Sequence, residues 1–144
     1  MIAAGRADAV VVGGGPAGAL SALLLARARA AVVLYEQSRY DAMRLVETLP
    51  PSVNPLLRRL GLWERFGALE ATPSYHMESV CGAAEPSDRS FVSSSYGHGW
   101  HVDRARFDAM LVDAAEQAGA RVLRGARVGK VSRVDAGLRV EADE

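Results

Sequence analysis

The sequence predicts a mixed α/β fold that begins with a strand, a turn, a helix and a second strand. Three observations lead to this prediction. The run Ala9-Val10-Val11-Val12 has the length and the β-branched content of a buried strand. The six residues that follow it, 13–18, carry glycines in the spacing Gly-x-Gly-x-x-Gly. An apolar, alanine-rich stretch and a second apolar run, residues 31–36, then complete a βαβ unit.

The glycine turn is the feature around which the other predicted elements are arranged. It comprises Gly13, Gly14, Gly15, Pro16, Ala17 and Gly18. Gly13 permits the tight turn out of the strand, Gly15 lets the backbone approach a pyrophosphate, and Gly18 lets the helix lie close to the sheet. The first N–H groups of the helix and its dipole favour an anion there. The sequence therefore predicts a dinucleotide site, against the alternative of a glycine-rich turn with a purely structural purpose.

The second strand ends in an acidic residue at the spacing that this prediction requires. Glu36 lies twenty-one residues after Gly15, close to the roughly 20 residues expected for a carboxylate that binds ribose hydroxyls. Gln37 follows it and is included in the predicted site. A glycine triplet alone is a weak signal, but here a strand precedes it, a helix follows it and the acid stands at the right distance. The alternative is that Glu36 is merely solvated.

Composition excludes several other classes of function. The chain has 144 residues, 49% hydrophobic content and zero formal net charge, and it contains no dense basic block. We therefore expect one domain at most, no nucleic-acid partner and no anionic membrane partner. The uncharged stretch after Asp8 contains the glycine turn and Pro16, so we expect no membrane span. Residues 1–8 do not resemble a signal peptide.

The residues that most often carry redox or metal chemistry give little signal. Cys81 is the single cysteine, so no internal disulfide is possible and a reducing, cytoplasmic location fits best. His76, His98 and His101 lack the spacing of metal ligands, and we expect no metal site. A catalytic role for Cys81, His98 or His101 remains open, and no catalytic residue is assigned.

The middle of the chain predicts short elements. Residues 37–41 form a polar loop, and Pro55 and Gly61 bracket a short helix. A second short helix is expected at 62–66, with Trp63 and Phe66 in the core. Two strands are expected at 74–80 and 90–95, joined by a turn at 82–88.

The last third of the chain again predicts a helix followed by a strand of the parallel sheet, and then a hairpin. Apolar residues recur at helical spacing after Asp103, a candidate N-cap, and the helix should end at Gln117 or Ala118 before Gly119. Residues 121–123 can extend a parallel sheet. Residues 126–134 and 138–142 alternate around a turn as a hairpin.

The chain resembles a known family in three segments. These are Val11-Val12-Gly13-Gly14-Gly15-Pro16-Ala17-Gly18, Arg44-Leu45-Val46-Glu47-Thr48-Leu49-Pro50 and Asp103-Arg104-Ala105-Arg106-Phe107-Asp108-Ala109-Met110-Leu111. Their combination and order resemble FAD-dependent monooxygenases and flavin-dependent halogenases of the aromatic-hydroxylase type, together with geranylgeranyl reductases. The resemblance implies a Rossmann-like FAD-binding βαβ domain with the start of an inserted antiparallel substrate-domain sheet. It places the FAD-binding domain, incomplete, at 1–73 and 98–144, and the excursion into the substrate sheet, also incomplete, at 74–97.

The same resemblance implies roles for two arginines. Arg44 and the segment after it would lie along the flavin, and Arg104 would help to hold the cofactor. The alternatives are that Arg44 is a loop cation and Arg104 a solvated first-turn residue. The chain departs from the family at Val46, where glycine is usual, and at Arg29-Ala30-Ala31, where a glycine usually joins the helix to the second strand. A left-handed residue at that junction would cost about 1 kcal/mol.

The chemistry that the resemblance implies is flavin-dependent oxidation. FAD would be reduced by NAD(P)H or by a reductase and would react with O₂ at an organic substrate, either a small molecule or a carrier- or protein-bound group. The family pattern continues beyond residue 144, so we expect an amino-terminal fragment that is inactive alone. Alternatives are a dinucleotide-binding module without turnover, a geranylgeranyl-reductase-like enzyme and a flavoprotein that modifies a partner protein in quinone-cofactor maturation. A nicotinamide-binding dehydrogenase domain is disfavoured by the third segment.

Overall fold

The chain folds into two compact units. The structure, a computed structural model, describes residues 5–42, 46–79, 87–135 and 137–143. One unit comprises Met1–Met43 and Asp108–Glu144, and the other comprises Arg44–Phe107. The segment 74–97 therefore belongs to the same compact unit as the residues on either side of it. The division into a cofactor domain and a substrate domain stays a prediction.

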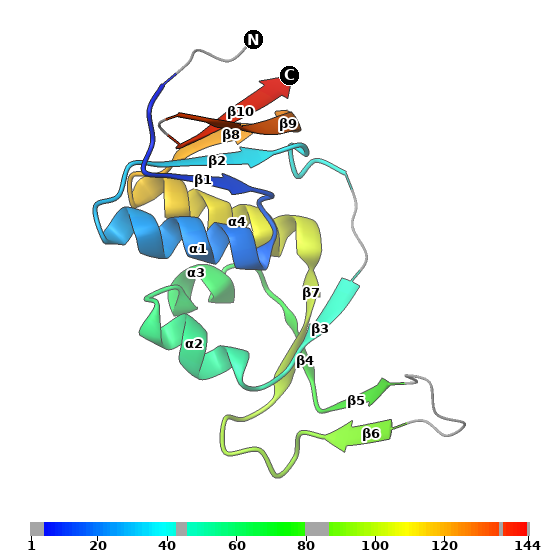
Figure 1. Cartoon of the computed structure of the whole chain (residues 1–144). Helices are drawn as coiled ribbons and strands as arrows, with labels where there is room; N and C mark the ends of the chain where they lie inside the picture. Colours follow the sequence, from blue (N-terminus) through cyan, green and yellow to red (C-terminus); the bar gives the residue numbers. More distant parts are fainter. Residues whose placement is uncertain (1–4, 43–45, 80–86, 136, 144) are drawn as a thin grey trace. The chain divides into compact units, whose positions relative to one another are not determined.

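The first unit is built on a parallel sheet (Figure 1). Its elements are β1 (Ala9–Val12), α1 (Pro16–Arg27), β2 (Val32–Glu36), the later part of α4 (Arg104–Gln117), β8 (Arg121–Arg124), β9 (Arg127–Val134) and β10 (Gly137–Asp143). The strand order is β1-β2-β8, and both strand pairs are parallel. The predicted βαβ start, the extension of the sheet by residues 121–123 and the antiparallel hairpin are all confirmed.

Small residues let α1 pack closely on this sheet. Ala19, Ala22, Leu23 and Ala26 are the buried residues of α1. A Cβ added at Gly18 would overlap the carbonyl oxygen of Gly13 and would lie 3.2 Å from the side chain of Val11. Glycine is therefore required at position 18 by the close approach of helix and strand, as the sequence predicted.

The junction between α1 and β2 uses a strained residue. Arg29 has φ of 65°, and the next N–H, that of Ala30, donates to the carbonyl of Leu25 at 3.1 Å. This is the bond of a Schellman motif, whose C′ position is usually glycine. Arg29 thus adopts the left-handed conformation at the junction where the usual glycine is missing. Strand β2 begins at Val32, one residue later than predicted.

The second unit consists of short helices and antiparallel strands. Its elements are β3 (Val46–Leu49), α2 (Val53–Arg59), α3 (Trp63–Gly67), β4 (Thr72–Ser74), β5 (His76–Ser79), β6 (Ser87–Ser90), β7 (Gly99–Asp103) and the first residues of α4. The strands form one sheet in the order β3-β7-β4 and a separate β5-β6 pair. Asp103 caps α4 as predicted, because its Oδ1 accepts the N–H of Ala105 at 2.8 Å.

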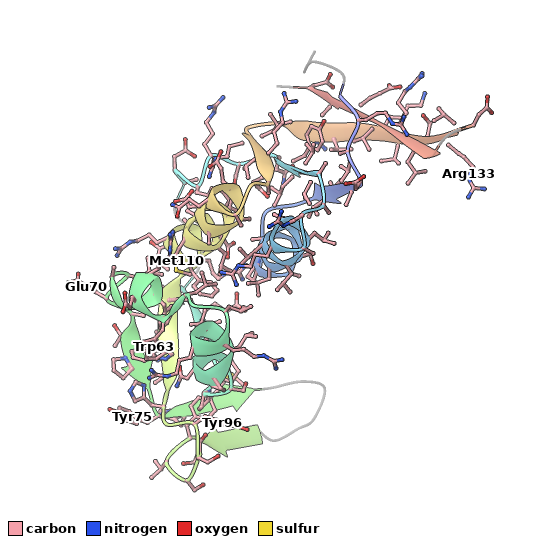
Figure 2. All side chains as sticks on the ribbon, turned by 90° about the vertical axis from the view of Figure 1, so that its left-hand side faces the viewer. Trp63, Glu70, Tyr75, Tyr96, Met110 and Arg133 are labelled. Carbon is pink, nitrogen blue, oxygen red and sulfur yellow. The ribbon has the colours of Figure 1, made fainter. Side chains whose placement is uncertain are left out.

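Aromatic side chains form the core of this unit, and Figure 2 labels one of them, Trp63. Phe66 is 2% exposed, and its ring centroid lies 5.4 Å from that of Trp100 and 5.9 Å from that of Phe107. Trp63 is half-buried beside them, with its ring centroid 6.2 Å from that of Trp100. The core role predicted for Trp63 and Phe66 is confirmed.

Several short elements differ from the prediction. The strand expected at 90–95 is wrong: β6 ends at Ser90, and turns follow, in which Ser94 donates to Phe91 O and Gly97 to Ser94 O. The strand expected at 74–80 divides into β4 and β5, which pair with different partners. The helix α2 begins at Val53 rather than at Pro55. Proline is tolerated in this first turn because its missing N–H would have no helical partner there.

Among the described residues, no helix combines the length and the apolar character that crossing a membrane requires.

Candidate dinucleotide site

The glycine turn joins the end of β1 to the start of α1. Gly13 has φ of 99°, and its N–H donates to the carbonyl of Tyr35 at 2.8 Å. A side chain at position 13 would be strained in this conformation, so the turn requires glycine there. Gly15 is the N-cap of α1, and Pro16 stands in its first turn. Proline is favourable there because the N–H group that it lacks would have no hydrogen-bond partner within the helix.

The start of α1 offers backbone donors to an anion. The first intrahelical bond runs from Ala19 N to Gly15 O at 2.9 Å, so the N–H groups of Ala17 and Gly18 precede the helical ladder. No side chain caps this end, and the first turn holds no acidic residue. The helix dipole and these amides therefore favour a phosphate, with no carboxylate of the first turn in competition.

Glu36 lies at the carboxyl end of β2 and faces the glycine turn. It is only 6% exposed. Its Oε2 accepts the N–H of Gly14 at 2.6 Å, and its Oε1 accepts the N–H of Ser38 at 2.8 Å. A buried carboxylate needs such donors. A carboxylate offers about four acceptor positions, so one such group can accept both backbone N–H groups and ligand hydroxyls.

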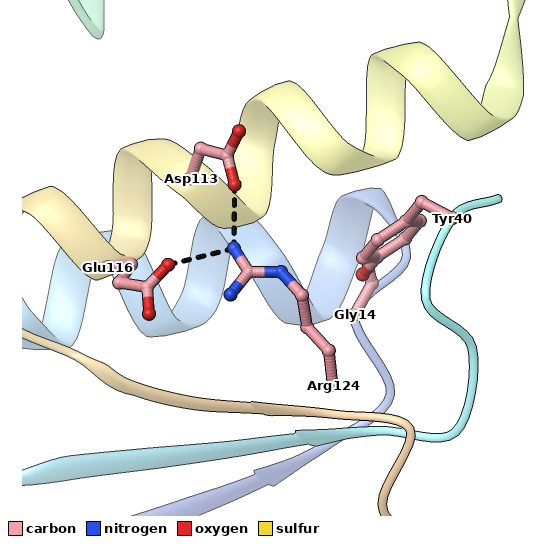
Figure 3. A network of polar contacts seen from close by, with 5 residues as sticks. All are labelled: Gly14, Tyr40, Asp113, Glu116 and Arg124. Carbon is pink, nitrogen blue, oxygen red and sulfur yellow. Dashed lines mark hydrogen bonds and ion pairs between the residues drawn. The ribbon is translucent and has the colours of Figure 1, made fainter.

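A tight turn after β2 is fastened to the same glycine turn. The hydroxyl of Tyr40 donates to the carbonyl of Gly14 at 2.8 Å, and Figure 3 shows the ring of Tyr40 beside Gly14. Tyr40 has φ of 60°, which is uncommon for a bulky residue. The sequence predicts residues 37–41 only as a polar loop, and no local pattern indicates this contact.

The turn after β8 meets the turn after β2. Gly125 N donates to Ser38 O at 3.2 Å, and Ala126 N donates to Glu36 O at 3.0 Å. Gly125 has φ of 76°, and a Cβ there would lie 3.0 Å from two guanidinium nitrogens of Arg39. The edge where a nucleotide is expected is thus formed by backbone from three turns.

An ion-pair cluster fixes α4 against the end of β8. Arg124 Nη2 lies 2.6 Å from Asp113 Oδ1 and 2.8 Å from Glu116 Oε2 (Figure 3). Burial lowers the pKa of the Arg124 guanidinium, but the hydrogen bonds and charges of Glu116 and Asp113 together outweigh burial and raise it. Arg124 is paired in register with Glu36, so the cluster stabilises the strand beside the candidate site.

The structure brings together most, but not all, of the predicted site residues. Gly13–Gly18, Glu36 and the exposed Gln37 lie at one end of the first unit's sheet. Arg104 lies in the second unit, where its guanidinium is paired with the carboxylate of Glu47 on β3. Arg44 and Cys81 fall outside the described residues. The assignment of Arg44 and Arg104 to the cofactor stays a prediction.

The two histidines of interest have structural partners in the second unit. His101 Nδ1 lies 2.9 Å from Thr48 Oγ1, on the neighbouring strand β3. His98 packs edge-on against Trp100 at a centroid distance of 4.4 Å. In the part of the chain that the structure describes, no group of three or more His, Cys, Asp or Glu side chains is placed to hold a metal ion.

Comparison with known proteins gives a consistent result. Residues 6–143 match a family model described as FAD binding domain. The chain is 32% identical over 124 residues to the flavin-dependent halogenase rdc2 of Metacordyceps chlamydosporia, covering 85% of the chain and 23% of that protein. It is 32% identical over 136 residues to the putative FAD-dependent oxidoreductase LodB of Marinomonas mediterranea, covering 93% of the chain and 37% of that protein.

Solved structures agree with the sequence comparison. The myxobacterial chondrochloren halogenase CndH superposes with a TM-score of 0.77 at 26% identity, over 92% of this chain and 32% of that one. The chain therefore spans about a quarter to two fifths of the length of these relatives.

Proposed function

The chain belongs to the FAD binding domain family, and on that premise we propose that it is the FAD-binding part of a flavin-dependent oxidoreductase of the monooxygenase and halogenase type. The observation that carries this proposal is the buried carboxylate of Glu36, fixed 2.6 Å from the N–H of Gly14. This position of the carboxylate, beside a turn of backbone amides, supports a role for Glu36 as acceptor of a ribose hydroxyl and a role for the amides at the pyrophosphate.

The donor set of the first unit fits the adenosine diphosphate half of FAD. The N–H groups at the start of α1 supply neutral donors and the dipole for the two phosphates. Glu36 supplies an anionic acceptor, which suits a ribose hydroxyl and repels a phosphate at the same position. Gln37 is exposed next to it and can contact the adenosine. In the second unit, Arg104 and the segment from Arg44 are proposed for the flavin half.

The chemistry that bound FAD supplies is reduction by NAD(P)H or by a separate reductase, followed by reaction with O₂ at an organic substrate. The chain's own residues bind and orient the cofactor. No described side chain is assigned a catalytic role. Residues 1–144 alone are therefore proposed not to turn over substrate, and the substrate, whether small or carried on another protein, would be selected elsewhere in the enzyme.

The halogenase interpretation is supported by the names of rdc2 and CndH, and the monooxygenase interpretation by the resemblance of the three sequence segments. A cytoplasmic location is proposed because a single cysteine suits a reducing compartment. A binding module without turnover remains the second candidate, because every described residue of the site acts in binding.

Titration with FAD tests the proposal. Glu36→Gln removes the negative charge. It also replaces one carboxylate oxygen by an NH₂ group, which cannot accept a hydrogen bond from the backbone N–H of Gly14 or Ser38. We expect FAD to bind about tenfold more weakly, because a hydrogen bond to a charged group contributes about 1.5–3 kcal/mol. The matched control is Glu64→Gln on the exposed surface of α3, which should leave the affinity unchanged.

Flavin fluorescence and the yellow absorption of the retained cofactor after desalting give the two readouts. A protein that binds NAD but not FAD would overturn the proposed function. Unchanged FAD affinity in Glu36→Gln would remove the ribose assignment of Glu36 alone.

A further inference from the structure

Both backbone polar groups of Gly14 are hydrogen-bonded, one by the last residue of β2 and the other by a residue of the turn that follows β2. Its N–H donates to Glu36 Oε2 at 2.6 Å, and its carbonyl accepts the hydroxyl of Tyr40 at 2.8 Å. The spacing of the acid predicted Glu36 as a ribose acceptor, but it did not predict this bond to Gly14. The Tyr40 contact lies outside the glycine motif and outside the set of residues assigned to FAD above.

The absence of a side chain at position 14 is explained by the same contact. A Cβ added at Gly14 would overlap the hydroxyl of Tyr40 and would lie 3.1 Å and 3.2 Å from Cβ and Cγ of Glu36. Gly14 does not have the positive φ of Gly13, so its backbone conformation does not require glycine. The close approach of Tyr40 and Glu36 does.

Tyr40 is held in an unfavourable backbone conformation by the turn around it. Its φ is 60°. The turn is fastened at its start by the bonds of Ser38, whose N–H donates to Glu36 Oε1 at 2.8 Å and whose carbonyl accepts Gly125 N at 3.2 Å. Strained residues persist where their surroundings determine them, and they cluster at ligand-binding segments.

The Tyr40 bond fixes the direction of a second group. The carbonyl of Gly14 and the N–H of Gly15 belong to one trans peptide, so they point in opposite directions. A hydroxyl that holds the carbonyl therefore also sets the direction of the Gly15 N–H, at the N-cap of α1. Amides at this position of a dinucleotide turn face the pyrophosphate.

We propose that Tyr40 is a positioning residue for FAD: its hydroxyl holds the Gly14–Gly15 peptide and so directs the Gly15 N–H to the pyrophosphate. This inference rests on the proposed function, because it concerns the same cofactor. It assigns a role to a residue that the glycine motif and the acidic residue do not predict.

Three ligands distinguish this role from a general structural one. Tyr40→Phe removes only the hydroxyl and keeps the ring. We expect it to weaken the binding of FAD and of ADP about five- to tenfold, the range of one hydrogen bond, while adenosine, which has no phosphate, binds as before. The control Tyr35→Phe removes a hydroxyl from β2 for which the described contacts include no hydrogen bond, and it should change none of the three affinities.

Each other outcome has a defined meaning. Equal losses for ADP and adenosine would overturn the proposal, because the hydroxyl would then support the whole site rather than the phosphate end. Tighter FAD binding in Tyr40→Phe would also overturn it, because the ring would then obstruct the cofactor. Unchanged FAD binding in Tyr40→Phe, with FAD bound normally by the unaltered protein, would overturn the inference and leave the proposed function standing. Failure of the unaltered protein to bind FAD or ADP would overturn both.

A double-mutant cycle tests the contact itself. Gly14→Ala should weaken FAD binding strongly, because the new methyl group overlaps the Tyr40 hydroxyl. In the Tyr40→Phe background the same change should cost less, since the overlapping atom is gone, so the two effects should not add. Additive losses would show that the two residues act independently and would contradict the proposed contact. Thermal unfolding of each variant checks that affinities are compared between folded proteins.

Discussion

Single residues decide how the chain leaves its regular elements. Among the residues that the structure describes, three non-glycine residues have positive φ, namely Arg29 at 65°, Tyr40 at 60° and Glu70 at 54°. For an L-residue this conformation costs roughly 1–2 kcal/mol relative to the right-handed region. Tyr40 gains a hydrogen bond to Gly14 in return, whereas Arg29 is exposed at the end of a helix. A substitution can therefore relieve the backbone strain at Arg29 without the loss of a hydrogen bond like that of Tyr40.

Arg29→Gly should stabilise the first unit. Glycine adopts the left-handed C′ conformation without a Cβ penalty, and its greater freedom in the unfolded chain offsets part of the gain. We expect the free energy of unfolding in urea to rise by about 0.5–1 kcal/mol. Arg29→Ala is the control, because it removes the same side chain but keeps the penalty. A gain of equal size in Arg29→Ala would assign the effect to the arginine side chain and not to the backbone.

Asn54, unlike Arg29, stabilises its surroundings through its side chain, because both the Nδ2 and the Oδ1 atoms form hydrogen bonds. It is 7% exposed; its Nδ2 donates to the carbonyls of Tyr96 and His98 at 2.9 Å and 3.0 Å, and its Oδ1 accepts the indole N–H of Trp100 at 2.7 Å. Asn54→Ala leaves these groups without this partner. We expect a loss of about 2–3 kcal/mol in unfolding free energy.

Tryptophan fluorescence is a specific probe for this variant, because the only two tryptophans, Trp63 and Trp100, both lie in the second unit. Leu56→Ala on the exposed side of the same helix is the control and should cost far less. Equal destabilisation by the two changes would show that the helix, and not the amide network, is what the unit depends on.

At the scale of elements, the sequence predicted those whose signal is local. The strand at Ala9–Val12, the glycine turn and the helix before Gly119 each carry their own periodicity or cap, and the structure confirms them. The strands β3 and β7 were missed, because each is short and its partner lies about fifty residues away, as Thr48 opposite His101 shows. Pairing at such distance has no signature within either segment.

The candidate site divides in the same way. The approach of Glu36 to the glycine turn takes place within one βαβ unit. The spacing of the residues predicted a ribose-binding role for Glu36, and that role stays a prediction. The contact of Tyr40 with Gly14 depends on a positive φ in a polar loop, which no residue pattern in that loop indicates. The position of Gly125 beside Ser38 depends on β8 (Arg121–Arg124), which comes much later in the sequence.

The ion-pair cluster of Arg124 connects α4 to the parallel sheet, and it provides a test at this scale. The side chains of Asp113 and Glu116 are 54% and 47% exposed, so solvent screens each pair. Arg124→Gln should therefore lower the unfolding free energy of the first unit by only about 1 kcal/mol. The difference in unfolding free energy between Arg124→Gln and the unaltered protein should be smaller in about 1 M salt, because salt screens the attraction between Arg124 and the two carboxylates in the unaltered protein.

The control for this variant is Arg121→Gln, at an exposed position of the same strand. Backbone amide exchange in β8 reports on the first unit without a tryptophan. An equal, salt-independent loss in both variants would mean that the arginines stabilise the strand by packing rather than by charge.

At the scale of the whole molecule, the unpaired edge of β1 bears on whether the protein associates with other chains. Among the described strands, β1 pairs only with β2 and stands at the edge of the sheet. Val10 and Val12 on it are 41% and 59% exposed. An apolar edge strand of this kind is a site of association with another strand. The chain also spans only 23% and 37% of the two curated relatives described above, whose additional length could supply such a strand.

Val12→Lys should therefore act in opposite directions in a short and a long protein. In the 144-residue chain the change removes an exposed apolar group and adds a charge at an edge, so the monomeric fraction in size-exclusion chromatography should rise. Val92→Lys is the control, because Val92 is 80% exposed but lies in a turn and not on a strand. In a longer protein whose further chain also covers the face of the sheet that carries Val12, the same Val12→Lys would bury a charge and should lower the unfolding free energy by several kcal/mol. Equal monomer content for both variants of the short chain would show that its association does not depend on β1. Unchanged stability of a longer protein would show that the face of the sheet that carries Val12 stays exposed to solvent there too.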